Sequence, residues 1–514
     1  MSSKDGSSKG LLVRALAMAA MAAVTTASAF AGELIAPFKG KVSEKALASD
    51  SAYQALAGSP ATAAIEVVKA NPRALEAGTQ RISLALPSGL RLRIRKVDSQ
   101  VTESGSVLWY GVVLNPGGRG LDFDPLNTLT VVRNNGKITG NLRYKGQWYQ
   151  IRPLQNGSHV LVTVDQSQVP SDDPADPLPS VPMAVDADAA MNKVNTVITV
   201  LVSYTPAAAS ASGDIDSLID LAFWEANQSY TTSGVAITLQ LAKKARVTYT
   251  ESNNSATDVS RYQGTSDGYM DYIHTQRTQY GADVAILLVG SLEFGIAGRA
   301  SGIGSSATTA FAVVHQLYAT GNYTFAHEIG HLQSARHDPA ADPSTTPYAF
   351  GHGYVYNGSP SWRTIMATGS NPRQNFFSTP NRLHNGVATG SSSTHDNARV
   401  LNLTAGTVAG FKTASGCIPD GGLDDTLSQT NCCSGYAVSG STYCTNPADW
   451  YNGWASCTHI CGSAPVGGCI PSGGIDDTYS STNCCSGAAI SGSTFCNDPA
   501  DYGDDWTTCA HICQ

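Results

Sequence analysis

The chain has 514 residues, which is too long for a single hydrophobic core, so three or more domains are expected. Its formal net charge is −8, and only 14% of its residues are charged. No cluster of Lys and Arg occurs, which argues against a nucleic-acid partner.

The first 31 residues have the pattern of a secretory signal sequence. Three basic side chains give a positively charged start (Lys4, Lys9 and Arg14), and an apolar, Ala-rich run extends from Leu16 to Val24. Two small-x-small cleavage sites follow within residues 27–31. The run is too short to cross a bilayer, and no other segment reaches about 18 apolar residues. We therefore expect residues 1–31 to be removed and the mature chain to be secreted, with no transmembrane segment.

Residues 32–168 are predicted to form a β-rich domain. Apolar and polar residues alternate in short runs that Gly and Asn turns separate, for instance at 90–94, 107–113 and 159–164. The region contains no Cys and no cluster of metal ligands, and His159 is expected at the surface. Residues 169–192 are rich in Pro, Asp and Ala, so we expect an extended, exposed linker with little apolar surface to bury.

Between residues 193 and 413 the pattern changes to alternating strands and helices. Apolar runs predict four strands, at 196–202, 235–239, 283–289 and 309–314. Apolar residues at helical spacing predict helices at 215–226, 267–280 and about 395–411. This region is therefore predicted to be an α/β (α+β) domain with a twisted mixed sheet.

One stretch in this domain carries the chemistry, His327-Glu328-Ile329-Gly330-His331. On a helix, residues four apart place both imidazoles on one face, where they can share a Zn²⁺ ion at about 2.0–2.1 Å. Glu328 cannot easily reach such an ion but can reach a water molecule bound to it. His337 can be a third ligand if the chain turns sharply near Ser334. Three protein ligands would leave the fourth position open for water, as in catalytic zinc sites.

This stretch has other possible interpretations. An ordinary surface helix could carry the same residues, but the HExxH pattern is rare by chance and a third His at this offset makes it rarer. A downstream Glu as third ligand is excluded, because no Glu follows Glu328. An Asp ligand stays open in principle, and His352 is a weak candidate for a fourth ligand.

The stretch from His327 to Asp338 resembles HExxHxxGxxHD, the zinc-binding sequence of the metzincin metallopeptidases, and the Asp after the third His resembles the reprolysin (adamalysin) branch. Residues 363–367 look like the family's Met-turn, which places Met366 as an apolar floor under the imidazoles. Astacins carry a Tyr two residues after that Met, where this chain has Thr368. Over roughly residues 193–413, the resemblance implies one catalytic zinc ion, a general base and a Met-turn, formed by His327, His331, His337, Glu328 and Met366.

The sequence departs from the family at one position of the motif. The family's Gly, which permits a left-handed turn, is Ser334 here, and a Ser in that conformation costs roughly 1 kcal/mol. If the turn were made differently, another residue would have to supply the third ligand.

The resemblance also implies roles for the neighbouring regions. Residues 32–168 would be a propeptide, with an accessory binding domain as the alternative, and the linker 169–192 would carry the activation cleavage. Many propeptides of this family block the zinc with a Cys thiolate, but no Cys precedes Cys417. The strand at 309–314 would be the antiparallel edge strand along which the substrate backbone pairs.

The end of the chain is a direct repeat that holds all twelve Cys. The six Cys of residues 417–461 recur 52 positions later in residues 469–514. An even count in small exported modules predicts three disulfides in each, with the pairing undetermined. A Cys/His zinc site around Cys457, His459 and Cys461 is the alternative, and Ca²⁺ binding by Asp424-Asp425 or Asp476-Asp477 is conceivable but unsupported.

These features predict a secreted zinc endopeptidase that hydrolyses polypeptides with a zinc-activated water and Glu328 as general base. The tail could bind a cell-surface polymer or protein. Two other classes stay open. The chain could be a cell-surface or polymer-binding protein, with Trp454 and Trp506 as stacking platforms, or a carrier of small disulfide toxin or inhibitor modules, with the peptidase domain secondary.

Overall fold

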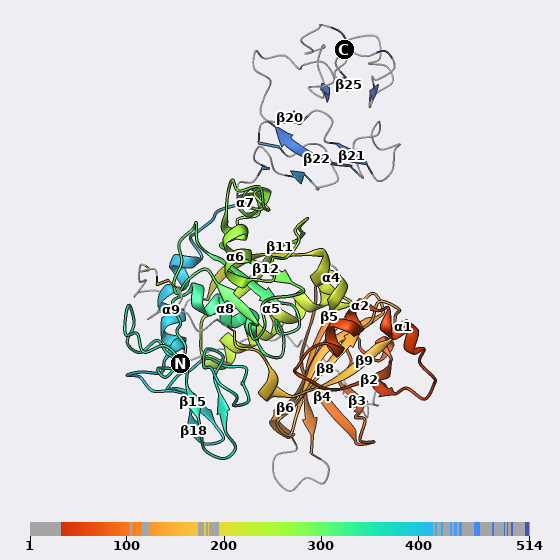
Figure 1. Ribbon diagram of the computed structural model, residues 1–514, viewed down its shortest axis with the longest axis vertical. Helices are drawn as coiled ribbons and strands as arrows, with labels where there is room; N and C mark the ends of the chain where they lie inside the picture. The colour runs from red at the N-terminus through yellow and green to blue at the C-terminus, as the bar shows by residue number, and fades with distance from the viewer. Residues whose placement is uncertain are drawn as a thin grey trace, which may run out of the picture.

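The computed structural model describes residues 32–414 except 103–104, 116–122, 173–178, 181–182 and 184–194. In the tail it describes residues 417–418, 423–424, 432–433, 436–438, 442–444, 457–462, 475–476, 488, 491, 495–496 and 509–512. The signal region, Trp454 and Trp506 therefore lie outside the described residues. Figure 1 shows an N-terminal barrel beside an α/β domain, with the Cys-rich tail above them.

Nine strands of the N-terminal region close into a barrel in the order β1-β2-β9-β8-β7-β6-β5-β4-β3, which confirms the predicted β-rich region. β1 and β3 pair in parallel, and the other neighbours are antiparallel. Two short helices, α1 (Glu44–Ala48) and α2 (Ser51–Ala57), lie between β1 and β2. The strands are β1 (Glu33–Pro37), β2 (Thr62–Ala70), β3 (Arg81–Ala85), β4 (Arg91–Val101), β5 (Val107–Leu114), β6 (Phe123–Asn134), β7 (Lys137–Tyr144), β8 (Gln147–Pro153) and β9 (His159–Val164).

His159 is buried in this barrel, so the expected surface position was wrong. Its side chain is 5% exposed, and its Nε2 accepts a hydrogen bond of 3.0 Å from the backbone N–H of Ile138. Side chains alternate along β9, and His159 shares the face of Leu161, which belongs to the barrel core. Burial, with a smaller effect of Lys137, lowers the pKa of His159 to about 4.

The α/β domain is built on a five-stranded sheet in the order β11-β10-β12-β14-β13. Its strands are β10 (Thr196–Tyr204), β11 (Ile237–Arg246), β12 (Val284–Val289), β13 (Gly298–Ala300) and β14 (Phe311–His315). Its helices are α4 (Pro206–Ser212), α5 (Ile215–Ser233), α6 (Ser255–Gln263), α7 (Tyr272–Gln279), α8 (Thr324–Leu332) and α9 (Asn397–Val408). Hydrophobic clusters lie on both faces of the sheet, so every residue of β12 is buried. Two small two-stranded sheets follow α8 and precede α9 along the chain. One pairs β15 (Val355–Tyr356) with β16 (Trp362–Arg363), and the other pairs β17 (Leu383–His384) with β18 (Val387–Ala388).

The predicted edge strand was assigned wrongly. β14 contains most of the predicted run 309–314, but it runs parallel to β12 inside the sheet. The antiparallel edge is β13, which pairs with β14 through Gly298, Arg299 and Ala300. A strand of three residues is too short to produce a recognisable apolar alternation, and the run at 311–314 is apolar because both of its faces are covered. Helix α6 was likewise not predicted.

The barrel docks on the segment that joins β14 to α8. Arg152 of β8 donates to Thr320 Oγ1 at 3.0 Å, and Asn141 of β7 donates to Glu225 Oε1 of α5 at 2.6 Å. The other carboxylate oxygen of Glu225 accepts from the N–H of Gly321 at 2.7 Å. The interface also has an apolar part, because Trp148 and other barrel residues share a hydrophobic cluster with Leu317 and Tyr318 of this segment.

Parts of the linker lie along the edge of the α/β domain. Ser171 forms a parallel bridge with Ile296, and Ser180 forms one with Ile303. The expectation of an exposed linker holds for Ser171 and Ser180 but is wrong for Asp172 and Met183, which are 2% and 9% exposed. Met183 belongs to the main hydrophobic cluster of the α/β domain. Composition did not predict this burial, because the partners of Asp172 come from other parts of the chain.

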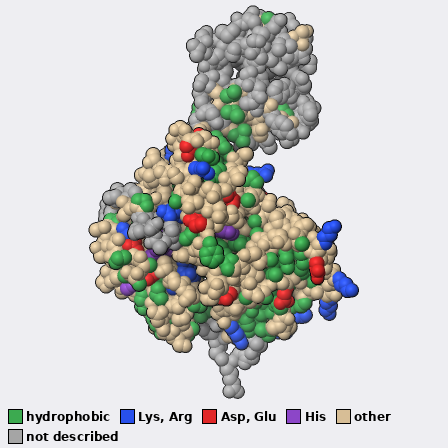
Figure 2. Space-filling model, in the orientation of Figure 1, with side chains coloured by type: hydrophobic (Ala, Val, Ile, Leu, Met, Phe, Trp, Pro, Cys, Tyr) green, Lys and Arg blue, Asp and Glu red, His purple; other side chains and the backbone are tan. Residues whose placement is uncertain are grey.

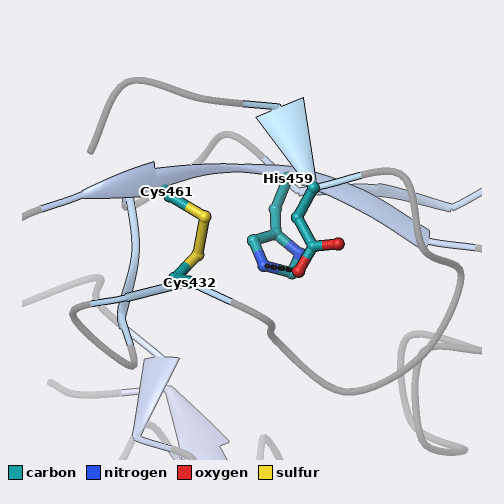
Figure 3. A group of neighbouring side chains, drawn as sticks. Cys432, His459 and Cys461 are labelled. Carbon is teal, nitrogen blue, oxygen red and sulfur yellow. Dashed lines mark ion pairs between the residues drawn. A yellow bond between two sulfur atoms is a disulfide. The ribbon is translucent and has the colours of Figure 1, made fainter. Parts of the chain in front are cut away.

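The first tail module is closed by three disulfides, Cys417–Cys433, Cys432–Cys461 and Cys444–Cys457. This confirms the predicted framework for residues 417–461. Figure 3 shows His459 beside the Cys432–Cys461 bridge, and His459 Nε2 lies 3.2 Å from Asp424 Oδ2. Because these Cys are oxidised, they cannot act as thiolate ligands, which removes the Cys/His zinc site. Asp424 is 1% exposed and paired with His459, so the structure adds no support for a solvated Ca²⁺ site there.

The described helices include none that is long and apolar enough to cross a membrane. On the face drawn in Figure 2, Lys and Arg side chains are scattered, with several along the edge that the barrel forms.

Candidate active site

Helix α8 (Thr324–Leu332) positions the HExxH residues at the centre of the α/β domain. It follows a tight turn in which Gly321 and Tyr323 have φ of 73° and 63°. All nine of its residues are buried, and Ile329 and Leu332 belong to the main hydrophobic cluster. Its apolar side chains therefore anchor a helix whose other face presents the imidazoles of His327 and His331.

The structure brings His327, His331 and His337 together. The Nε2 atoms of His327 and His331 are 2.9 Å apart, and the Nε2 atom of His337 lies 3.1 Å from each of them. The two helix residues are buried, and His337 is half-buried. A single ion with bonds of about 2.0–2.1 Å can reach nitrogens at this spacing.

The hydrogen bonds behind the rings set their tautomers. His327 Nδ1 donates to the carbonyl oxygen of Ile365, and His331 Nδ1 donates to that of Ala335, both at 2.8 Å. A carbonyl only accepts, so Nδ1 carries the proton and Nε2 of each neutral ring presents a lone pair. Lone pairs that converge at about 3 Å repel one another unless a cation lies between them. The donor set therefore fits a zinc ion.

The turn that returns His337 is made by Ser334 in a left-handed conformation, with φ of 70°. The Ser334 N–H donates to His331 O at 2.8 Å, and the Ala335 N–H donates to Gly330 O at 3.0 Å. Ser334 thus adopts the left-handed conformation that the motif assigns to Gly. The hydroxyl of Ser334 is buried and forms no hydrogen bond with the part of the chain that the structure describes.

The residues of the predicted Met-turn lie against α8. Met366 is fully buried, and its Sδ would be 2.7 Å from a Cβ added at Gly330, so this Gly leaves room for the sulfur. Asp338 holds the segment from the other side, because its Oδ1 accepts from the N–H of Thr368 at 2.8 Å and from its hydroxyl at 2.9 Å. The Asp after the third His therefore joins the motif to the Met-turn.

Glu328 lies between α8 and the edge of the sheet. A Cβ built on Gly298 of β13 would come within 2.5 Å of Glu328 Oε1 and 2.8 Å of Thr324 Cγ2. The carboxylate therefore occupies the space that the absent side chain of Gly298 leaves. His352, the weak ligand candidate, does not join the three imidazoles, and its Nδ1 instead contacts the backbone oxygen of His337 at 2.8 Å.

A second cluster next to the histidines was not predicted. Asp172 of the linker forms a short ion pair with Arg373 and lies 3.8 Å from His327 Nδ1. Its other oxygen accepts from Thr324 Oγ1 at 2.7 Å and from Asn322 Nδ2 at 3.3 Å. Burial disfavours ionisation of Asp172, but Arg373 outweighs it and holds the pKa of this carboxyl below its usual value.

Comparison with known proteins agrees with this geometry. Residues 194–378 match the model of metallopeptidase family M12 described as Reprolysin_5. A peptidyl-Asp metalloendopeptidase of Stenotrophomonas maltophilia (strain K279a) is 43% identical over 80% of this chain and 100% of its own length. The chain belongs to the family of these metalloendopeptidases. It is accordingly a zinc metalloendopeptidase, and the binding-protein and toxin-carrier alternatives are not favoured.

The chain is also similar to a second relative and, weakly, to a solved structure. A peptidyl-Asp metalloendopeptidase of Xanthomonas campestris pv. campestris is 43% identical over 71% of this chain and 89% of its own length. The crystal structure of metalloproteinase-II from Bacteroides fragilis is 14% identical, with a TM-score of 0.34, over 50% of this chain and 81% of that one. The second likeness is too weak to carry a conclusion.

Proposed function

We propose that the chain is the precursor of a secreted endopeptidase that cleaves polypeptides at aspartate, with a metzincin-like catalytic domain. The observation that carries this proposal is the convergence of three imidazole Nε2 atoms, 2.9–3.1 Å apart, beside Glu328. The preference for aspartate is taken from the names of the relatives, peptidyl-Asp metalloendopeptidases.

His327, His331 and His337 would hold the zinc ion, with Met366 as the floor beneath them. When bound, zinc polarises a peptide carbonyl and lowers the pKa of a water molecule towards about 7. Glu328 accepts the proton of the attacking water and delivers it to the amine that leaves. Once the linker is removed, the edge of β13 offers backbone groups to an extended substrate.

The domain roles follow from the same proposal. Residues 1–31 are the signal sequence, 32–168 the propeptide, 169–192 the linker with the activation cleavage, and 193–413 the peptidase. Disulfides such as those of the first module form in oxidising compartments, which supports export. The relative from Stenotrophomonas is aligned over its full length and still leaves a fifth of this chain unmatched. This supports a tail, modules 417–461 and 469–514, that is accessory to catalysis and free to bind a surface polymer or protein.

The test is a pair of substitutions at the site. Glu328→Gln should retain one zinc per chain and lose at least about 10³-fold in hydrolysis of casein and of Asp-containing peptides, because proton transfer is removed while the ligands remain. His337→Ala should lower zinc content as well as activity. Metal analysis and peptide assays, with and without a chelator, measure both.

Glu293→Gln is a matched control, because that carboxylate contacts Ser255 and not the histidines. It should keep both zinc and activity. Hydrolysis at the wild-type rate by Glu328→Gln would refute the proposed base, and unchanged zinc in His337→Ala would mean that another residue is the third ligand.

A further inference from the structure

The linker follows the same open edge of the sheet that the peptidase offers to substrates. Ser171 donates from its N–H to Gly295 O at 2.9 Å, and its carbonyl accepts from Ala297 N at 2.6 Å. Farther along, the carbonyl of Pro179 accepts from Ile303 N at 2.8 Å. The linker therefore forms backbone hydrogen bonds with residues just before and just after β13 (Gly298–Ala300). A polypeptide substrate could not use that edge at the same time.

Asp172 leaves this path and enters a buried, positively charged pocket. Arg373 is 3% exposed, and its Nη1 donates to the backbone oxygen of Asn322 at 3.0 Å. Arg363 is 6% exposed and, like Arg373, donates to the carbonyl of Ala367, next to the Met-turn residue. Thr324 is the first residue of α8, so the positive end of that helix also faces the carboxylate.

The pocket requires an anion. A buried guanidinium is costly unless a carboxylate pairs with it, and in the described part of the chain Asp172 is the acid that forms an ion pair with Arg373. The remaining acceptors of Arg373 are backbone carbonyls. Removal of the linker would therefore leave a buried cation, two neutral donors and a helix N-terminus facing an open pocket beside His327. Such a pocket matches the side chain of aspartate in charge and length.

We propose that Arg373, Thr324 and Asn322 form the pocket that selects aspartate in the substrate, and that Asp172 fills it in the uncleaved chain as an internal mimic of the substrate. This assignment rests on the proposed aspartate preference. It also accounts for latency in a chain that lacks a Cys switch. The carbonyls of Ser171 and Asp172 accept from Ala297 N at 2.6 Å and Gly298 N at 2.9 Å, so the strand edge and not the three imidazoles holds them, which protects the mimic from cleavage.

The first experiment measures specificity. Activated wild type and Arg373→Lys, Arg373→Gln and Thr324→Val are assayed on quenched fluorescent peptides that differ only in Asp, Asn or Ala at one position. The ratio of kcat/KM for Asp over Asn should fall at least about 30-fold in both Arg373 variants and several-fold in Thr324→Val, because a lost charged hydrogen bond costs more than a neutral one. Arg277→Lys is the control, since Arg277 is 1% exposed and donates to backbone carbonyls away from this pocket.

The second experiment measures latency in the full chain. Asp172→Asn should raise the activity of intact, uncleaved protein on the Asp peptide at least about 10-fold, with cleavage followed on gels of the same samples. Asp165→Asn, the same change at an exposed residue of the barrel–linker junction, should behave as wild type. A synthetic peptide of residues 169–183 should inhibit the activated enzyme, and its Asp172→Asn form should inhibit at least about 10-fold less.

The outcomes separate the two proposals. If the activated wild type does not distinguish Asp from Asn peptides, the aspartate preference itself fails. If wild type prefers Asp and the Arg373 variants keep that ratio with normal zinc content, the pocket is assigned wrongly. Equal latency of wild type and Asp172→Asn, with equal inhibition by the two peptides, would refute the mimic even if the pocket is correct.

Discussion

Single residues decide whether the third histidine reaches the site. Ser334 has φ of 70° in the position where the metzincin motif has Gly, and this left-handed turn returns His337 to within 3.1 Å of the other two imidazoles. The residue thus bears a backbone strain of about 1–2 kcal/mol, with its hydroxyl buried. The local geometry is retained because Ala335 and the helix carbonyls hold both sides of the turn.

Ser334→Gly should therefore stabilise the catalytic domain by about 1 kcal/mol. Relief of the strain and of the buried hydroxyl exceeds the roughly 0.4–1 kcal/mol by which Gly favours the unfolded chain. The measurement is thermal or denaturant unfolding in a Glu328→Gln background, which prevents self-digestion. Ser344→Gly, in an exposed loop, should shift stability in the opposite direction. A loss of stability in Ser334→Gly would show that the turn is not strained.

Burial of His159 should make the stability of the barrel depend on pH. Burial lowers its pKa to about 4 from about 6.5, so folding favours the neutral ring. Its contribution is complete above pH 6.5 and is lost as the pH falls towards 4, by on the order of 2–3 kcal/mol. His159→Gln, which can still accept from Ile138, should flatten this dependence between pH 7 and pH 4.5. Parallel pH curves for the two proteins would contradict the assignment.

At the scale of elements, the contact between β13 and α8 positions Glu328, the proposed general base. The three residues of β13 form the edge of the sheet that the linker covers, and Gly298 leaves the space that the Glu328 carboxylate occupies. Neither feature is visible in the local sequence, because a strand this short has no periodicity and the relevant contact joins residues thirty positions apart.

Gly298→Ala should reduce kcat/KM by at least about 10²-fold while zinc is retained. The new Cβ would stand 2.5 Å from Glu328 Oε1, and displacement of a catalytic group by about 1 Å has costs of this order. Peptide assays with metal analysis test this. Gly410→Ala, at the end of α9 where the nearest atom would be 3.5 Å away, is the control. Normal turnover in Gly298→Ala would mean that the edge has room for both groups.

At the scale of the whole molecule, the tail and the peptidase are stabilised by different means. The α/β domain has a large buried core and no Cys, whereas each module of about 45 residues is too small to fold on apolar burial alone. In the second module Cys496 faces Cys509 across two strands, as Cys444 faces Cys457 in the first, and the six Cys have the same spacing. Its bridges should therefore be Cys469–Cys485, Cys484–Cys513 and Cys496–Cys509.

Reduction of the disulfides should unfold the tail and leave the peptidase domain folded. Each disulfide contributes about 2–4 kcal/mol, so a reductant that does not chelate metal should make the tail sensitive to proteases and leave peptidase activity and zinc unchanged. Thiol titration of the denatured, unreduced protein should find no free Cys among the twelve, and peptide mapping should give the predicted pairs. Loss of catalysis on reduction would mean that the tail supports the catalytic domain.

The sequence by itself determined the parts of this protein that depend on short separations. His327, Glu328 and His331 lie within about one turn of helix, and His337 follows after a short turn, so their spacing and the family resemblance predict a zinc site. The six Cys recur at a constant interval, so the repeat is visible in the sequence. Only the tertiary structure decided the edge strand, the disulfide pairing and the burial of Asp172 against Arg373. The last of these joins residues 201 positions apart in a pocket built from the linker, α8 and the segment after the Met-turn. No local pattern encodes such a contact, because its energy comes from charges that meet only after the chain has folded.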